Sequence, residues 1–173
     1  MARRYKTRKA SARPRKPATL PKYKQMIQDC QECILNGRML AIDPSTGSRS
    51  SMPGYAVFQG GKLIESGTIE VDLKGNRAER LYEINRTIRE DFDVPDVVAV
   101  ESAGYFIGKM NPASIISLQR AIGAVIAAHP VKCLIEVPSN VWQKHTFPGY
   151  IKGDEHDAIC IGLCAINTAR EFM

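Results

Sequence analysis

Four acidic residues of this chain occupy positions from which they could act together. Asp43 and Glu101 each follow a short apolar run, and Asp154 and Asp157 lie three residues apart where a helical pattern begins. Each apolar run predicts a strand, and residues three apart share one face of a helix. We therefore expect the four carboxylates to converge at one edge of a sheet.

Carboxylates gathered in a partly buried place raise one another's pKa unless cations neutralise them. Ligation by carboxylates, with no set of His or Cys at the strand ends, suits hard ions such as Mg²⁺, with Mn²⁺ able to substitute. Two such ions about 4 Å apart catalyse in-line hydrolysis of phosphodiesters. The pattern predicts a two-metal nuclease site.

Each acid also has a purely structural interpretation. An Asp before Pro starts many turns, which would explain Asp43, and Glu101 could simply reach solvent at the end of its strand. Asp154 suits a helix N-cap, and Asp157 suits the first turn of a helix because of the helix dipole. Their order along one chain favours a shared site over separate coincidences.

Two neighbouring side chains could join this site. Glu155 and His156 lie between Asp154 and Asp157. Successive residues of an α-helix point about 100° apart, so neither shares the direction of Asp154. The spacing favours Asp157 as the partner of Asp154, with Glu155 and His156 left as alternatives.

A sheet with flanking helices has to position these acids. Strands are predicted over 39–43, 54–59, 62–71, 97–100 and 133–137, and helices over 76–92, 112–128 and 154–171. Three consecutive strands with tight connections predict an antiparallel meander, and the helical crossovers predict parallel strands. The expected fold is α/β, a mixed five-stranded sheet with antiparallel strands one to three and parallel strands four and five, flanked by helices.

Charge divides the chain into three segments. Residues 1–24 hold ten Lys or Arg and no acid, so the remaining chain carries 14 basic and 18 acidic residues. We expect a basic disordered tail over 1–18 that suits phosphate contacts, a helix over 19–37 and one domain over 38–173. A solubilising arm or an organellar transit peptide would also explain the tail.

The cysteines and the hydropathy indicate the cellular compartment in which the protein acts. Five cysteines are an odd number, which disfavours a disulfide framework, and Cys30 and Cys33 lack a second pair at zinc-site spacing. No apolar run approaches the roughly 20 residues that span a bilayer. We expect a cytoplasmic protein that does not bind a membrane.

The ordered motifs resemble those of the RuvC-type Holliday junction resolvases of the RNase H-like superfamily, in a divergent or viral branch. The resemblance covers about residues 38–172. It rests on Ile42-Asp43-Pro44 with Gly54-Tyr55-Ala56-Val57, Val100-Glu101 with Phe106-Ile107-Gly108-Lys109, the helix that starts at Asn111-Pro112-Ala113-Ser114, and Asp154-Glu155-His156-Asp157-Ala158.

This resemblance implies a homodimer that resolves four-way or otherwise branched DNA by paired symmetric nicks, with two Mg²⁺ per active site, in a bacterial cell or a phage-infected host. The implied catalytic residues and metal ligands are Asp43, Glu101, Asp154 and Asp157. The residues expected to contact DNA are Arg49, Tyr105, Phe106, Lys109, Lys144 and Lys152. Trp142 could flank the nucleic acid or close the edge of the core.

Some features depart from the family pattern. The loop after Asp43 is enlarged over 48–52, two extra residues precede Phe106, and almost nothing separates Lys152 from Asp154, where bacterial relatives carry a helix. Two alternatives therefore stay open. One is another RNase H-like nuclease that cuts flaps or RNA–DNA hybrids, and the other is a non-catalytic DNA-binding protein of the same fold.

Overall fold

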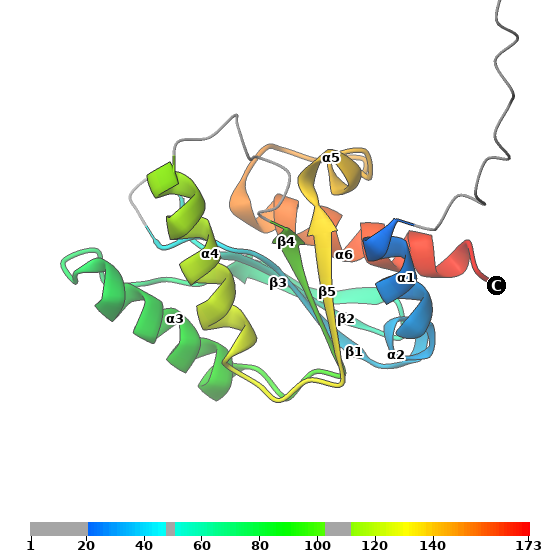
Figure 1. The fold of residues 1–173 in the computed structure, drawn as a ribbon, viewed down its shortest axis with the longest axis horizontal. Coiled ribbons are helices and arrows are strands. Elements are labelled where there is room, and N and C mark those ends of the chain that lie inside the picture. The colour runs from blue at the N-terminus through cyan, green and yellow to red at the C-terminus, as the bar shows by residue number, and fades with distance from the viewer. Residues whose placement is uncertain (1–20, 48–50, 103–111) are drawn as a thin grey trace, which may run out of the picture.

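A mixed five-stranded sheet lies at the centre of the computed structural model, which describes residues 21–47, 51–102 and 112–173 (Figure 1). The strands are β1 (Arg38–Asp43), β2 (Gly54–Gln59), β3 (Lys62–Thr68), β4 (Val97–Ser102) and β5 (Cys133–Pro138). Their order is β3-β2-β1-β4-β5, antiparallel between β1, β2 and β3 and parallel between β1, β4 and β5. The predicted mixed sheet is confirmed.

Helices cover both faces of this sheet (Figure 1). They are α1 (Lys22–Asp29), α2 (Gln31–Asn36), α3 (Arg77–Asp91), α4 (Pro112–Ile126), α5 (Ser139–Trp142) and α6 (Asp154–Arg170). The pair α3 and α4 packs on one face, and α6 with α1 and α2 packs on the other. Of the helices described, none is long and apolar enough to cross a membrane.

Strand β1 shows how the sequence builds two cores. Met39 and Ala41 are buried on the α6 side, whereas Leu40 and Ile42 are buried on the side of α3 and α4. Alternate residues of a strand face opposite sides of a sheet, so an apolar run without polar interruptions suits a central strand covered on both faces. The last residue of this run carries the first candidate acid to the sheet edge.

The N-terminal segment differs from the single helix expected over 19–37. The chain forms α1 and α2 instead, with a break at Cys30, whose φ of −105° and ψ of 9° leave the helical range. The Cys30 amide hydrogen bonds to the carbonyl oxygens of both Met26 and Ile27 at 3.2 Å. The break lets Ile27 and Ile34, one on each helix, both reach full burial in the core beside α6.

Strand β3 is shorter than the predicted 62–71. It ends at Thr68 because its partner β2 begins at Gly54, which lies opposite Thr68 in the antiparallel register. Ile69 and Val71 beyond it are still buried, against the α3 side of the sheet. Their apolar alternation extended the prediction past the strand's end, although the Ile69 amide still donates to the carbonyl oxygen of Pro53 at 2.8 Å.

Candidate active site

The carboxyl ends of the parallel strands place two candidate acids side by side. Ile42 of β1 pairs with Val100 of β4, so the residues that follow, Asp43 and Glu101, occupy neighbouring positions at the same sheet edge. Because side chains alternate along a strand, both point to the face that α6 covers. The predicted juxtaposition of these two acids agrees with the register.

Gly54 brings the other two acids to this edge. A Cβ atom on Gly54 would lie 1.8 Å from the carbonyl oxygen of Asp154 and 2.1 Å from its carbonyl carbon. The first turn of α6 therefore crosses directly over the start of β2, at a separation that only glycine permits. Since Gly54 pairs with Asp43, this crossing sets the start of α6, with Asp154 and Asp157, beside the end of β1.

Asp43 is the electrostatic centre of the four acids. Burial raises the pKa of Asp43 well above its ordinary value, and the negative charges of Glu101, Asp157 and Asp154 raise it further. Within the described part of the chain, the Asp43 carboxylate accepts no hydrogen bond and forms no ion pair. A carboxylate in these surroundings is stabilised by an added cation.

Glu101 and Asp157 each accept a hydrogen bond from an aromatic side chain. Trp142, which is 4% exposed, donates from Nε1 to Oε1 of Glu101 at 3.3 Å. The hydroxyl of Tyr150 donates to Oδ1 of Asp157 at 2.6 Å. Burial raises the pKa of Glu101, against the lowering effect of Trp142, and the hydrogen bond to Asp157 is the main cause that raises the pKa of Tyr150 to about 12. Both donors are uncharged, so they orient these acids without neutralising them.

Asp154 is held by the loop that leads into β2. Its Oδ2 accepts from the Met52 amide at 2.9 Å, and its Oδ1 accepts from the Ser51 hydroxyl at 3.3 Å. The Ser51 hydroxyl also lies 3.1 Å from the hydroxyl of Ser45, which is two residues beyond the end of β1. This chain of contacts connects the first turn of α6 to the segment just beyond Asp43.

A cleft of about 420 Å³ opens beside Asp43 and Glu101. Hydroxyl groups dominate its remaining wall. Its lining residues are Asp43, Pro44, Ser45, Thr46, Ser51, Glu101, Ser114, Ser117 and Leu118. Two acids at the base, with hydroxyls from the loop after β1 and from α4, form a polar cleft that suits a phosphate-bearing strand.

The donor set suits a hard divalent cation, because three carboxylates surround that of Asp43 with no cation from the described chain to balance them. In residues 21–47, 51–102 and 112–173, however, no three His, Cys, Asp or Glu side chains are gathered closely enough to enclose one ion. The acids therefore affect Asp43 through their charges without forming a closed ligand set. To bind an ion, their side chains would have to turn toward that ion.

The two alternative ligands at the start of α6 are engaged elsewhere. Oε1 of Glu155 accepts from the Ser66 hydroxyl of β3 at 2.7 Å. The His156 ring stacks on Phe147, with ring centroids 5.6 Å apart. Neither contributes to the charge around Asp43, so the arrangement favours Asp154 and Asp157, as the helical spacing indicated.

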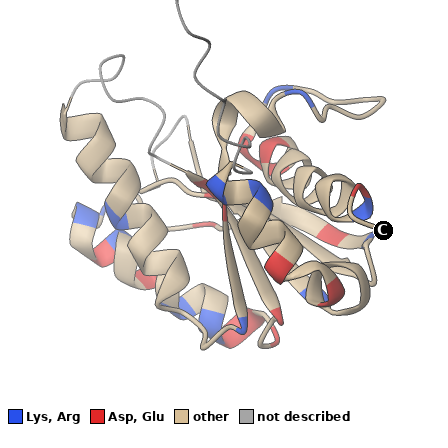
Figure 2. Cartoon of the chain, turned by 45° about the vertical axis from the view of Figure 1, so that its right-hand side comes forward, with Lys and Arg blue, Asp and Glu red and all other residues tan. Residues whose placement is uncertain are grey.

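The predicted DNA contacts are described only in part. Lys144 and Lys152 are exposed in the segment between α5 and α6, and neither forms an ion pair with a described residue. Basic positions also lie on α1 and α3 (Figure 2). The other candidates, Arg49, Tyr105, Phe106 and Lys109, lie outside the described residues.

Several residues around the acids were missed at the level of sequence. Tyr150 carried no local signal, because a tyrosine in a loop gives no indication of its hydrogen-bond partner. Trp142 was expected either at the core edge or beside nucleic acid, and it is buried with its N–H on Glu101. Gly54 was part of a recognised motif, but its role in the approach of α6 depends on the tertiary structure.

Comparison with known proteins supports the fold. No protein-family model matches the chain, and no curated protein sequence matches it. A solved structure of Thermus thermophilus RuvC in complex with Holliday junction substrate is similar, with a TM-score of 0.58 and 18% identity over 79% of this chain and 96% of that one. A second Thermus thermophilus RuvC structure gives a TM-score of 0.50 and 17% identity over 78% and 96%. The chain therefore has a RuvC-like, RNase H-like fold, as its motifs predicted.

Proposed function

We propose that this protein is a divalent-cation-dependent endonuclease that resolves four-way or otherwise branched DNA junctions by paired nicks. The observation that carries the proposal is the position of Asp43, at the end of a central strand of a RuvC-like sheet and surrounded by three further acids with no described counter-cation. The similar RuvC structure in complex with Holliday junction substrate supports branched DNA as the substrate class.

The four acids share one task in this proposal. Asp43, Glu101, Asp154 and Asp157 would hold Mg²⁺, or Mn²⁺ in its place. Bound ions supply an activated water and stabilise the leaving oxygen of the cut phosphodiester. The strand and the helix start fix the positions of these acids, and the hydroxyl-lined cleft beside Asp43 would accept the backbone of the cut strand.

A homodimer is part of the proposal because a symmetric junction needs two active sites. The described residues leave one side of helix α4 exposed, which carries Ile116 and Gly123 together with Gln119 and Arg120. Ile116 is 50% exposed, and a Cβ on Gly123 would meet nothing within 4 Å. In sedimentation or light-scattering measurements we expect Ile116→Asp to shift the full chain toward a monomer, whereas exposed Tyr82→Asp on α3 should not.

The proposal is tested on four matched substrates, namely a synthetic four-way junction, a linear duplex, a flap and an RNA–DNA hybrid, each with Mg²⁺ or with EDTA. We expect paired nicks in the junction, dependent on Mg²⁺ and lost in Asp43→Asn. Asp96→Asn is the matched control, since it changes another acid outside the site. Preferred cutting of the flap or hybrid would favour another RNase H-like nuclease, and binding without cutting would favour a DNA-binding protein.

The basic tail is proposed to strengthen DNA binding near the site. Its attachment point supports this idea, because Lys22, Tyr23 and Met26 of α1 line a small pocket with Ser102 and Pro138 at the ends of β4 and β5. Deletion of residues 1–20 removes eight of the ten basic residues and leaves α1 intact. We expect weaker junction binding with a smaller dependence on salt concentration. An unchanged salt dependence would show that the tail does not contact phosphates.

A further inference from the structure

One short segment supplies donors to acids on two different elements. Residues 139–152, which comprise α5 and the loop after it, carry both Trp142 and Tyr150. The first reaches Glu101 on β4 and the second reaches Asp157 on α6.

Both hydrogen bonds have the geometry of an orienting contact. Trp142 engages only Oε1 of Glu101, and Tyr150 engages only Oδ1 of Asp157. No described residue donates to the second oxygen of either carboxylate. An uncharged donor fixes a carboxylate without cancelling its charge, which is the role of the groups that surround metal ligands in proteins.

Packing fixes both donors in place. Trp142 is buried in the core beside α6. The Tyr150 ring meets Phe147 edge-on at 6.0 Å and His156 edge-on at 6.1 Å, and Phe147 stacks on His156. His156 immediately precedes Asp157 on α6, so the aromatic cluster braces the helix turn that carries this acid.

From this arrangement we infer that Trp142 and Tyr150 are positioning residues for a divalent cation, because each holds one carboxylate oxygen, of Glu101 or of Asp157, and leaves the other oxygen to turn toward the ion. The inference rests on the proposed function, since it assumes that the acids bind a cation. Loss of either donor leaves a carboxylate free to rotate, and the ion must then order it. Changes to such surrounding groups cost about 10- to 100-fold in metal affinity or activity.

Tyr150→Phe is the sharpest test, because it removes the hydroxyl and keeps the ring. Tyr55→Phe is the matched control, since the Tyr55 hydroxyl donates to Glu65 at 2.9 Å on an exposed part of β2 and β3. Mn²⁺ binding to the full chain is measured by calorimetry or by electron paramagnetic resonance. Junction cleavage is measured against Mn²⁺ concentration, and melting is followed in EDTA.

We expect Tyr150→Phe to bind Mn²⁺ about 10-fold or more weakly. Cleavage should recover at higher Mn²⁺, and melting in EDTA should match that of Tyr55→Phe. Trp142→Phe, which tests Glu101 independently, should weaken Mn²⁺ binding in the same direction.

Three outcomes separate the inference from the proposed function. Wild-type protein that binds Mn²⁺ and cuts junctions, with Tyr150→Phe and Trp142→Phe binding equally well or more tightly, would overturn the inference alone. A wild type that binds Mn²⁺ and loses affinity in both variants, yet cuts no nucleic acid, would support the inference and refute the nuclease. A wild type that binds no Mn²⁺ would overturn both.

Discussion

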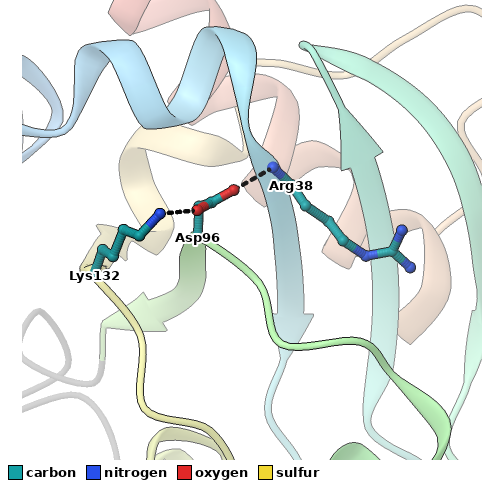
Figure 3. Close-up of polar contacts among 3 residues, drawn as sticks. All are labelled: Arg38, Asp96 and Lys132. Atoms are coloured by element: carbon teal, nitrogen blue, oxygen red, sulfur yellow. Dashed lines mark hydrogen bonds and ion pairs between the residues drawn. The ribbon is translucent and has the colours of Figure 1, made fainter.

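Two aspartates at opposite ends of the central strands have opposite electrostatic surroundings. Asp96 precedes β4 and accepts hydrogen bonds from the Lys132 ammonium at 2.6 Å and the Arg38 amide at 3.1 Å (Figure 3). These contacts, Lys132 first, lower the pKa of Asp96. Asp43 ends β1 at the other edge, where burial and three acids raise its pKa well above the ordinary value.

This contrast separates a structural acid from a functional one. The chain supplies donors to Asp96, and Gly37 leaves room for its carboxylate, since a Cβ at Gly37 would lie 2.7 Å from Oδ2 of Asp96. For Asp43 the described chain supplies further negative charge instead. A fold that keeps uncompensated acids together gives up stability, which is understandable where an external cation completes the site.

The largest expected effect compares the two acids by the same substitution. Asp43→Asn removes the central acid and should lower junction cleavage by more than about 100-fold, beyond the cost of losing a surrounding group. Asp96→Asn should cut at close to the wild-type rate when corrected for folded protein. Both are measured by single-turnover cleavage of a labelled junction. Equal losses of cleavage in the two variants would show that Asp43 and Asp96 do not differ in function.

Gly54→Ala tests whether the acidic edge depends on the close approach of α6. The added methyl group meets backbone atoms of Asp154 and Glu155, which cannot rotate away. We expect a loss of about 1–3 kcal/mol in the free energy of unfolding, typical of overpacking, together with loss of cleavage. Urea unfolding and the junction assay measure the two effects. Gly123→Ala, whose Cβ meets no neighbour, is the control for stability. Wild-type stability and cleavage in Gly54→Ala would show that the site does not depend on the close contact between α6 and β2.

Asp43 and Asp96 should affect the pH dependence of stability with opposite signs. The folded-state pKa of Asp43 is raised, so the folded protein holds this proton more tightly than the unfolded chain, and stability falls as pH rises through that range. In EDTA at neutral pH, Asp43→Asn should therefore melt at a higher temperature than the wild type. The difference should fade below about pH 4, near the unfolded pKa of Asp. A lower melting temperature for Asp43→Asn across this range would contradict the assignment.

Asp96→Asn should show the reverse behaviour, with a smaller effect. The folded-state pKa of Asp96 is lowered, so its contribution is present above the unfolded pKa and is lost as pH falls through the folded-state value. At neutral pH we expect a melting temperature lower by a few degrees, with the deficit shrinking in acid. Thermal unfolding followed by circular dichroism measures it. A deficit that grows toward low pH would argue against the Lys132 and Arg38 contacts as its cause.

Local patterns in the sequence determined much of the fold and the set of candidate acids. The apolar runs before Asp43 and Glu101 predicted two strands that end on carboxylates, and the spacing of Asp154 and Asp157 predicted one helix face. These features depend on the two-residue and 3.6-residue periods of strands and helices, which neighbouring residues reveal. The mixed sheet followed from the order of these elements.

The tertiary structure alone decided how the acids are held. Met52 and Asp154 are separated by 102 residues, and Trp142 and Glu101 by 41, so no local period connects them. The break at Cys30 and the end of β3 likewise depend on contacts with distant elements. Periodicity indicates which face of an element is buried, but only packing decides which donor meets which acid. This is why the sequence pointed to Asp43 and its three acidic neighbours, and only the fold showed which donors hold those neighbours and that Lys132 neutralises Asp96.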